Sequence, residues 1–135
     1  MIRFILDTNV FISGIFWPGI PARILDACEQ EKAIMLVSSE ILEEYFRIVE
    51  IMTNKKPAVD VSRYINLITL TAELCTPIKL LHPVSRDPDD DKFIATALAA
   101  NCKLIVSGDK DLLDVSGYAE IKIIKPAVFV KQFDL

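Results

Sequence analysis

The chain has 135 residues, of which 52% are hydrophobic, so it is long and apolar enough to form one domain with a substantial core. This composition excludes intrinsic disorder, and no apolar run approaches the roughly 20 residues that span a bilayer. The net charge of −4 argues against a protein that coats nucleic acid non-specifically. It is compatible with an enzyme that meets phosphate through metal ions. We therefore expect a single domain over residues 1–135.

The three cysteines, Cys28, Cys75 and Cys102, are an odd number and are widely spaced among apolar neighbours. This pattern is typical of reduced, buried thiols rather than of a disulfide framework or a zinc site. Met1 leads directly into an expected strand, without the basic segment and cleavage site of a signal peptide. We therefore expect a cytoplasmic protein with no membrane partner.

The chain begins with a short β-forming run. Residues 2–6 (IRFIL) predict a buried strand that ends at Asp7. A carboxylate that follows a buried parallel strand lies in the crevice where open α/β sheets bind ligands, although Asp7 and Asn9 can also form a simple turn or cap. The apolar pattern continues over residues 10–15 without indicating an element type, and residues 17–19 (WPG) break it.

The next segment indicates a helix, a strand and a second helix. Pro21 suits the first turn of a helix over residues 21–31, and residues 34–37 predict a buried strand. Ser38 or Ser39 is expected to cap a helix that reaches about Met52. The remaining predicted elements are a helix over 60–75, a strand over 78–81, a helix that starts near 90, a strand over 104–106, a helical turn at 112–113, a strand over 121–124 and a terminal helix or tail over 126–135.

Two adjacent glutamates differ in the face of the helix that they occupy. Glu43 projects away from the apolar stripe and is expected to be a solvated surface acid. Glu44 lies within the apolar arc, between Ile48 and Ile51, and is expected to face the interior. The alternative is that Glu44 lies at the rim of the stripe, with its carboxylate in water.

Four aspartates fall within residues 87–91 (DPDDD), immediately before the apolar run of a buried helix. Helical spacing places Asp90 on the same stripe as Phe93, whereas Lys92 falls on the opposite side. Asp90 is therefore expected to point inward, where a carboxylate is costly unless a cation meets it. The alternative is that Asp89 or Asp90 caps the helix and the other acids are solvated.

A second aspartate follows a strand directly near the end of the chain. Residues 107–111 (SGDKD) come after the apolar run 104–106, and Gly108 permits close approach of the backbone. His82 is the only histidine, and it precedes a proline in a predicted loop. No partner pattern for a serine or cysteine nucleophile accompanies it, so we expect no catalytic role.

A parallel sheet with helices on both faces can bring Asp7, Glu44, Asp90 and Asp109 together at one edge. Two carboxylates 4 Å apart repel by about 4 kcal/mol at an effective dielectric of 20, so four stay ionised only around hard cations. Oxygen ligands without cysteine or histidine favour Mg²⁺ or Mn²⁺ over zinc. Mg²⁺ completes its shell with water and substrate phosphate, which makes phosphodiester hydrolysis the expected chemistry.

Four segments in this order resemble the PIN domain, most closely the VapC-type toxins of prokaryotic toxin–antitoxin modules. The segments are LDTNV at 6–10, the helical Glu44, Asp90 before FIATA at 93–97, and SGDKD at 107–111. The resemblance implies a three-layer α/β/α fold with a central, mainly parallel twisted sheet. It also implies a metal-dependent ribonuclease, commonly dimeric and inhibited by an antitoxin protein.

The resemblance assigns the catalytic and metal-binding roles to the four acids Asp7, Glu44, Asp90 and Asp109. It implies supporting roles for Asn9, Ser107, Asp87 and Asp111, the first two through hydrogen bonds. Which of Asp87, Asp90 and Asp91 contacts the metal ion stays open. We expect Mg²⁺, with Mn²⁺ as the possible substitute, an RNA substrate, an antitoxin partner and a homodimer.

Two other classes of function are considered. Phosphoryl-transfer domains of the receiver or haloacid-dehalogenase kind also place aspartates at strand ends. The dehalogenase pattern requires a second aspartate where this chain has Asn9, and the paired acids and central aspartate of a receiver are not found. The other alternative is a non-catalytic module that binds RNA or a protein partner, against which the complete set of four acids argues.

Overall fold

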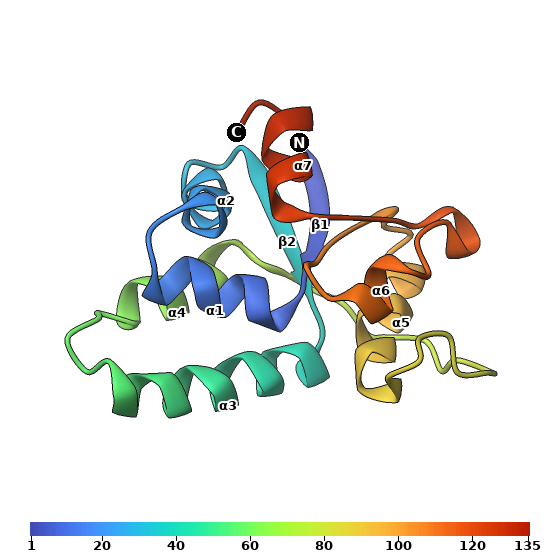
Figure 1. The fold of residues 1–135 in the computed structure, drawn as a ribbon, viewed down its shortest axis with the longest axis horizontal. Helices are drawn as coiled ribbons and strands as arrows, with labels where there is room; N and C mark the ends of the chain where they lie inside the picture. Colours follow the sequence, from blue (N-terminus) through green and yellow to red (C-terminus); the bar gives the residue numbers. More distant parts are fainter.

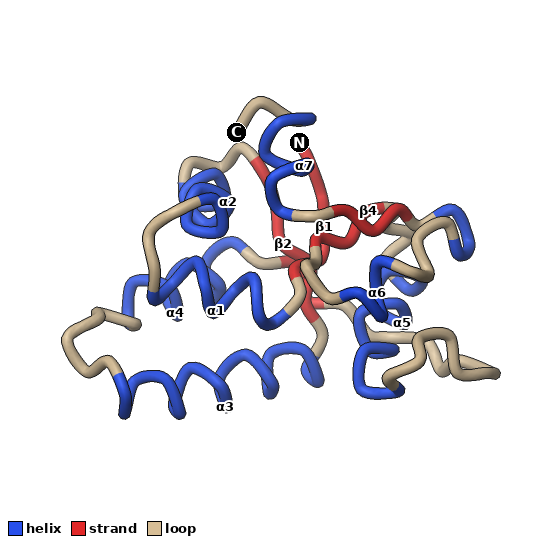
Figure 2. Tube along the Cα trace, viewed as in Figure 1, coloured by secondary structure: helices blue, strands red, loops and turns tan.

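The structure is a computed structural model that describes all 135 residues. Its centre is a sheet of five parallel strands in the order β3-β2-β1-β4-β5 (Figure 2). The strands are β1 (Ile2–Leu6), β2 (Ala33–Val37), β3 (Glu73–Leu74), β4 (Leu104–Val106) and β5 (Lys122–Ile124). The predicted α/β class and parallel sheet are confirmed.

Helices flank this sheet on both sides, with α1 to α4 on one side of β1 and β2 and with α5 and α6 on the other (Figure 1). The terminal helix α7 packs beside α2, and its Phe129 ring lies 4.8 Å from that of Phe4 in β1. The helices are α1 (Thr8–Phe16), α2 (Ile20–Glu29), α3 (Ser39–Lys55), α4 (Ser62–Thr71), α5 (Asp91–Ala99), α6 (Lys110–Leu113) and α7 (Pro126–Gln132), with short 3₁₀ helices η1 (Pro88–Asp90) and η2 (Tyr118–Glu120). None of them is both long and apolar enough to cross a membrane.

The strand order reverses at β1, and this reversal creates the crevice of the molecule. From β1 the chain moves outward to β2 and β3, then returns to place β4 on the other side of β1. In the register, Leu6 lies beside Val106, and the Asp7 N–H donates to the Val106 carbonyl at 2.9 Å. The residues that follow β1 and β4 therefore leave the sheet side by side at its carboxyl edge, where open parallel sheets bind their ligands.

Helix α1 occupies the apolar run for which the sequence pattern predicts no element type. Seven of its nine residues are buried, so it shows no polar face. A helix buried on all sides lacks the 3.6-residue alternation by which a helix is recognised. Its Phe11 ring stacks on Tyr45 of α3 with centroids 4.2 Å apart, and the Tyr45 hydroxyl donates to the Leu6 carbonyl.

The prediction of a strand over residues 78–81 is wrong, because this segment is a loop. The strand β3 lies earlier, where the predicted helix over 60–75 was expected to end, since α4 ends at Thr71. Leu36 and Val37 of β2 pair with β3, and the Cys75 N–H extends the pairing to the Val37 carbonyl at 2.7 Å. Pro77 lacks an N–H group and cannot continue the ladder.

Other details agree closely with the sequence. Ser38 caps α3 by accepting the Ile41 N–H at 3.2 Å, and Pro21 lies in the first turn of α2. All three thiols are free, and Cys28 and Cys102 are buried as predicted, whereas Cys75 is only half-buried and departs from the prediction.

Gly14 allows α1 and α2 to approach each other closely, and this contact generates a prediction. A Cβ atom at this position would lie 2.7 Å from Leu25 Cδ1 and 2.8 Å from the Pro21 carbonyl oxygen. We expect Gly14→Ala to lower the free energy of unfolding by about 1–3 kcal/mol, although alanine favours an isolated helix. Thermal or urea unfolding measures this change.

Gly108→Ala is the matched control, because a Cβ atom there meets no atom within 4 Å. Its stability should stay within about 0.5 kcal/mol of the wild type. Equal stability of the two variants would show that the contact between α1 and α2 is not close.

Candidate metal centre

Three aspartates of the crevice each precede a helix directly. Asp7 precedes α1, Asp90 precedes α5 and Asp109 precedes α6. The positive end of a helix dipole stabilises a nearby carboxylate by about 0.3–1 kcal/mol. The three aspartates therefore bring negative charge to one place, and the dipoles of the helices that follow them offset part of the repulsion.

Ser107 connects two of these aspartates. Its hydroxyl donates to Asp7 Oδ2 at 2.7 Å and accepts the Asp109 N–H at 2.9 Å. Asp7 is buried, and burial raises its pKa, whereas the Ser107 hydrogen bond lowers it and the charges of Asp109 and Glu44 raise it further. Asp7 is thus a buried acid held in one orientation close to two other carboxylates.

The carboxylates of the acidic segment 87–91 differ in their surroundings: some accept backbone N–H groups, and one is buried. Asp87 caps η1 by accepting the Asp89 N–H at 3.0 Å, and Asp91 accepts the backbone N–H groups of Val84 and Ser85 at 3.1 and 2.8 Å. Asp90 points inward, as predicted, and is only 7% exposed. It caps no helix with its side chain, so the capping interpretation of Asp90 is wrong.

Asp90, Asp109 and Asp111 can each offer one oxygen such that the three oxygens lie within 4.8 Å of one another. Asp109 Oδ1 accepts the Asp111 N–H at 3.0 Å, and Arg86 forms an ion pair with Asp111 at 3.0 Å. Asp90 Oδ2 is buried without any hydrogen-bond partner. An unpartnered buried carboxylate oxygen facing two other carboxylates is the arrangement that a bound cation completes.

The protonation of Asp90 reflects this unfavourable environment. Burial, followed by the neighbouring Asp109 carboxylate, raises the pKa of Asp90 to about 8. A divalent cation removes both causes, because it replaces lost solvation and cancels the repulsion. The donor set contains only oxygen, which suits Mg²⁺ or Mn²⁺.

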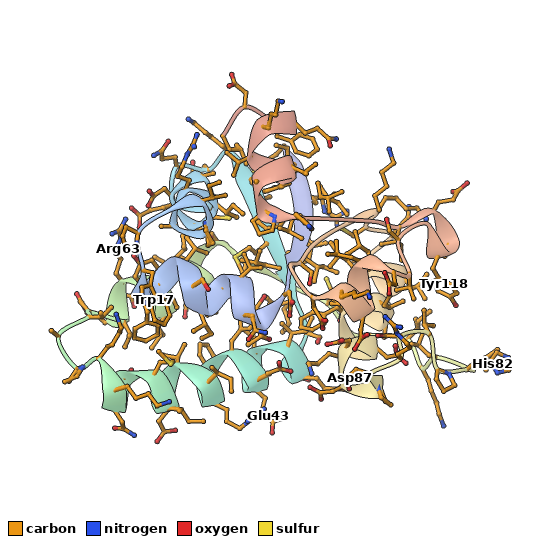
Figure 3. All side chains as sticks on the ribbon, viewed as in Figure 1. Trp17, Glu43, Arg63, His82, Asp87 and Tyr118 are labelled. Atoms are coloured by element: carbon orange, nitrogen blue, oxygen red, sulfur yellow. The ribbon has the colours of Figure 1, made fainter.

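Glu44 of α3 reaches this region but is already paired with a cation. Its side chain is 17% exposed, and it forms an ion pair with the Nζ atom of Lys92 in α5. Glu43 is exposed and points away from the rest of the molecule (Figure 3). The predicted difference between the two glutamates is confirmed, whereas Glu44 does not belong to the three-aspartate group.

Two cavities open beside the acids. One of about 380 Å³ is lined by Asp7, Asn9, Ser13, Gly108 and Asp109, among others, and Asn9 is exposed. A larger one of about 720 Å³ lies between α3, the start of α5 and the loop 77–83, and its lining includes Glu44 and Lys92. His82 lies at the far tip of this loop (Figure 3) and is exposed.

Two basic residues at the site were not identified from the sequence. The spacing of Asp89 and Lys92 allows an i, i+3 ion pair on a helix, but nothing in the sequence relates Lys92 to Glu44, 48 positions earlier. Arg86 bridges Asp111 and Asp114 from a loop that has no periodic pattern. Both pairings depend on tertiary contacts.

The structure is thus an α/β domain with a parallel sheet and an acidic crevice where the strand order reverses. The profile of the PIN domain matches residues 3–111, which include all four predicted acids. The chain is also 32% identical to the uncharacterized protein MJ1680 of Methanocaldococcus jannaschii, over 98% of this chain and 92% of that protein. The chain belongs to the PIN domain family, whose members are generally metal-dependent nucleases.

The raised pKa of Asp90 gives a prediction for the metal-free protein. Between pH 4 and 8 the folded protein keeps a proton on Asp90 that the unfolded chain loses near the ordinary pKa of about 3.9. The folded state then binds more protons, so its stability falls as the pH rises through this range. We expect the melting temperature in EDTA to fall less steeply with pH in Asp90→Asn than in the wild type.

Glu50→Gln removes an exposed acid of α3 and should keep the wild-type slope. Parallel curves for Asp90→Asn and the wild type would contradict the assignment of a proton to Asp90.

Proposed function

We propose that the protein is a metal-dependent endoribonuclease that hydrolyses RNA phosphodiester bonds and acts as the toxin of a toxin–antitoxin pair. The observation that carries the nuclease part is the buried, unpartnered Oδ2 of Asp90 beside Asp109 and Asp111. Membership of the PIN domain family supports the same reaction class.

In this proposal, Asp90, Asp109 and Asp111 hold a divalent ion, Mg²⁺ or Mn²⁺, and Asp7 completes the acidic surroundings. When bound there, such an ion would supply a water molecule of lowered pKa and positive charge for the phosphate. Ser107 fixes the orientation of Asp7 and of the Asp109 backbone through its two hydrogen bonds. The cavity beside Asp7 and Asp109 gives the phosphate access to the acids.

The proposed RNA substrate and the proposed toxin role both rest on the resemblance of the four sequence segments to VapC-type toxins. An antitoxin protein and a second copy of the chain are then the expected partners. Apolar side chains exposed on α3 and α4, such as Ile51 and Leu70, offer surface for such contacts. The three free thiols are suited to the reducing cytoplasm, which is where a toxin of this kind acts.

The nuclease proposal predicts different effects for the two adjacent glutamates. Glu44→Gln should reduce cleavage of a labelled single-stranded RNA by about 10- to 100-fold, as should Asp7→Asn, because each removes a charge inside the site. Glu43→Gln should keep wild-type cleavage, since this side chain is exposed on the outer face of α3. Gel assays in millimolar Mg²⁺ or Mn²⁺ measure the rates.

The same assay separates the alternative functions. EDTA should abolish cleavage, and a labelled DNA of the same sequence tests the preference for RNA. Binding of RNA without cleavage would favour the non-catalytic module. Equal losses in Glu43→Gln and Glu44→Gln would contradict the assigned helix faces.

A metal ion should also stabilise the folded chain, because the unfolded chain has no preformed site. Mg²⁺ at about 100 times its dissociation constant adds about 2.7 kcal/mol, so the wild-type melting temperature should rise. In EDTA near neutral pH, Asp90→Asn should melt above the wild type, because asparagine folds without the proton that Asp90 must take up on folding. Mg²⁺ should change the melting temperature of this variant much less than that of the wild type. A lower melting temperature in EDTA with an unchanged response to Mg²⁺ would make Asp90 a structural residue only.

A further inference from the structure

Lys92 is the most enclosed cation of the structure that takes part in an ion pair. Its side chain is 8% exposed, and its Nζ atom forms ion pairs with Glu44 and, at 3.1 Å, with Asp89 Oδ1. The same ammonium donates to the Asp89 carbonyl at 2.7 Å and lies 5.4 Å from the centroid of the Phe93 ring. Three acceptors and one aromatic ring therefore fix the ammonium between α3 and η1.

This pair differs from the other ion pairs of the molecule. Arg3 with Glu73, Arg63 with Glu29, and Arg86 with Asp111 all have side chains that are more than a third exposed. Such exposed pairs contribute little to stability and exchange readily with water. Lys92 and Glu44 are both largely desolvated, and separating them leaves two charges without partners in a poorly solvated place.

The position of Lys92 bears on the number of metal ions that the site can take. Two-metal sites hold their ions about 3.5–4 Å apart with carboxylates on both sides. Here one group of carboxylates, Asp90, Asp109 and Asp111, is arranged for an ion. Glu44, a further acid of the predicted site, lies outside this group and already faces a positive charge supplied by the chain.

We propose that Lys92 takes the place of a second metal ion, so that the site binds a single divalent ion at Asp90, Asp109 and Asp111. Glu44 is then the counter-ion that positions Lys92 rather than a metal ligand. The inference rests on the proposed metal site and specifies how many divalent ions that site binds. Lys92 is a positioning residue that neutralises Glu44 and keeps a second ion out.

The test counts Mn²⁺ ions bound to the full chain by calorimetric titration and by electron paramagnetic resonance of the free ion. The wild type should bind one Mn²⁺. Lys92→Met keeps the length of the side chain but removes its charge, which frees Glu44, and it should bind two. Lys92→Met combined with Glu44→Gln should return to one. Lys79→Met, which removes an exposed lysine from the same cavity, is the control and should bind one.

A second measurement needs no variant that loses the Lys92 charge. Ammonium protons of a buried, paired lysine exchange slowly enough to give a ¹⁵N-correlated NMR signal. This signal should persist in the wild type saturated with Mg²⁺ and should be lost in Glu44→Gln. It remains informative if Lys92→Met fails to fold.

Several results would overturn the inference. They are two Mn²⁺ ions in the wild type, one ion in folded Lys92→Met, two ions in the double variant, or displacement of the Lys92 signal by Mg²⁺. A wild-type protein that binds no Mn²⁺ would contradict the proposed function itself, and the inference with it.

Discussion

The parallel pairing of β1 with β4 is the constraint on which the acidic crevice depends. The hydrogen bond from the Asp7 N–H to the Val106 carbonyl aligns the ends of the two strands. Asp7 and Ser107 then leave the sheet side by side, and the Ser107 hydroxyl joins Asp7 to Asp109. A slip of one residue in this register would turn one of these side chains to the opposite face of the sheet.

Charge balance explains how so many acids remain in one folded site. Arg86 offsets Asp111, Lys92 offsets Glu44, and Ser107 donates a hydrogen bond to Asp7. Asp90 has no such compensation at Oδ2. The protein thus supplies positive charge or hydrogen bonds around the rim of the cluster and leaves Asp90 Oδ2 at its buried centre without a partner. This division explains why the acids are tolerated before any ion binds.

The sequence predicted the features that local patterns encode. The strand ends at Asp7 and before Ser107, the inward turn of Asp90 and the different faces of Glu43 and Glu44 all follow from period and position. Helix α1 was missed because its burial on all sides removes the amphipathic signal.

Features that depend on distant contacts lay beyond such reasoning. Strand β3 has two residues and exists because β2 offers an edge to which it pairs. Lys92 was placed on the side opposite the core, and its ion pair with Glu44 requires α3 and α5 to be assembled. The sequence also did not show which acid of segment 87–91 lacks a hydrogen-bond partner. That depends on which backbone N–H groups donate to Asp87 and Asp91 in the folded chain.

The central place of β1 in the sheet has a consequence for the newly made chain on the ribosome. Strand β1 is synthesised first but is flanked by β4, which begins at residue 104. A nascent chain that has already folded its first three strands and α1 to α4 still lacks Ser107, Asp109 and Asp111. The acidic crevice is therefore completed only when most of the polypeptide has left the exit tunnel. A chain that ends before residue 107 lacks Ser107, Asp109 and Asp111, and with them the greater part of the acidic crevice.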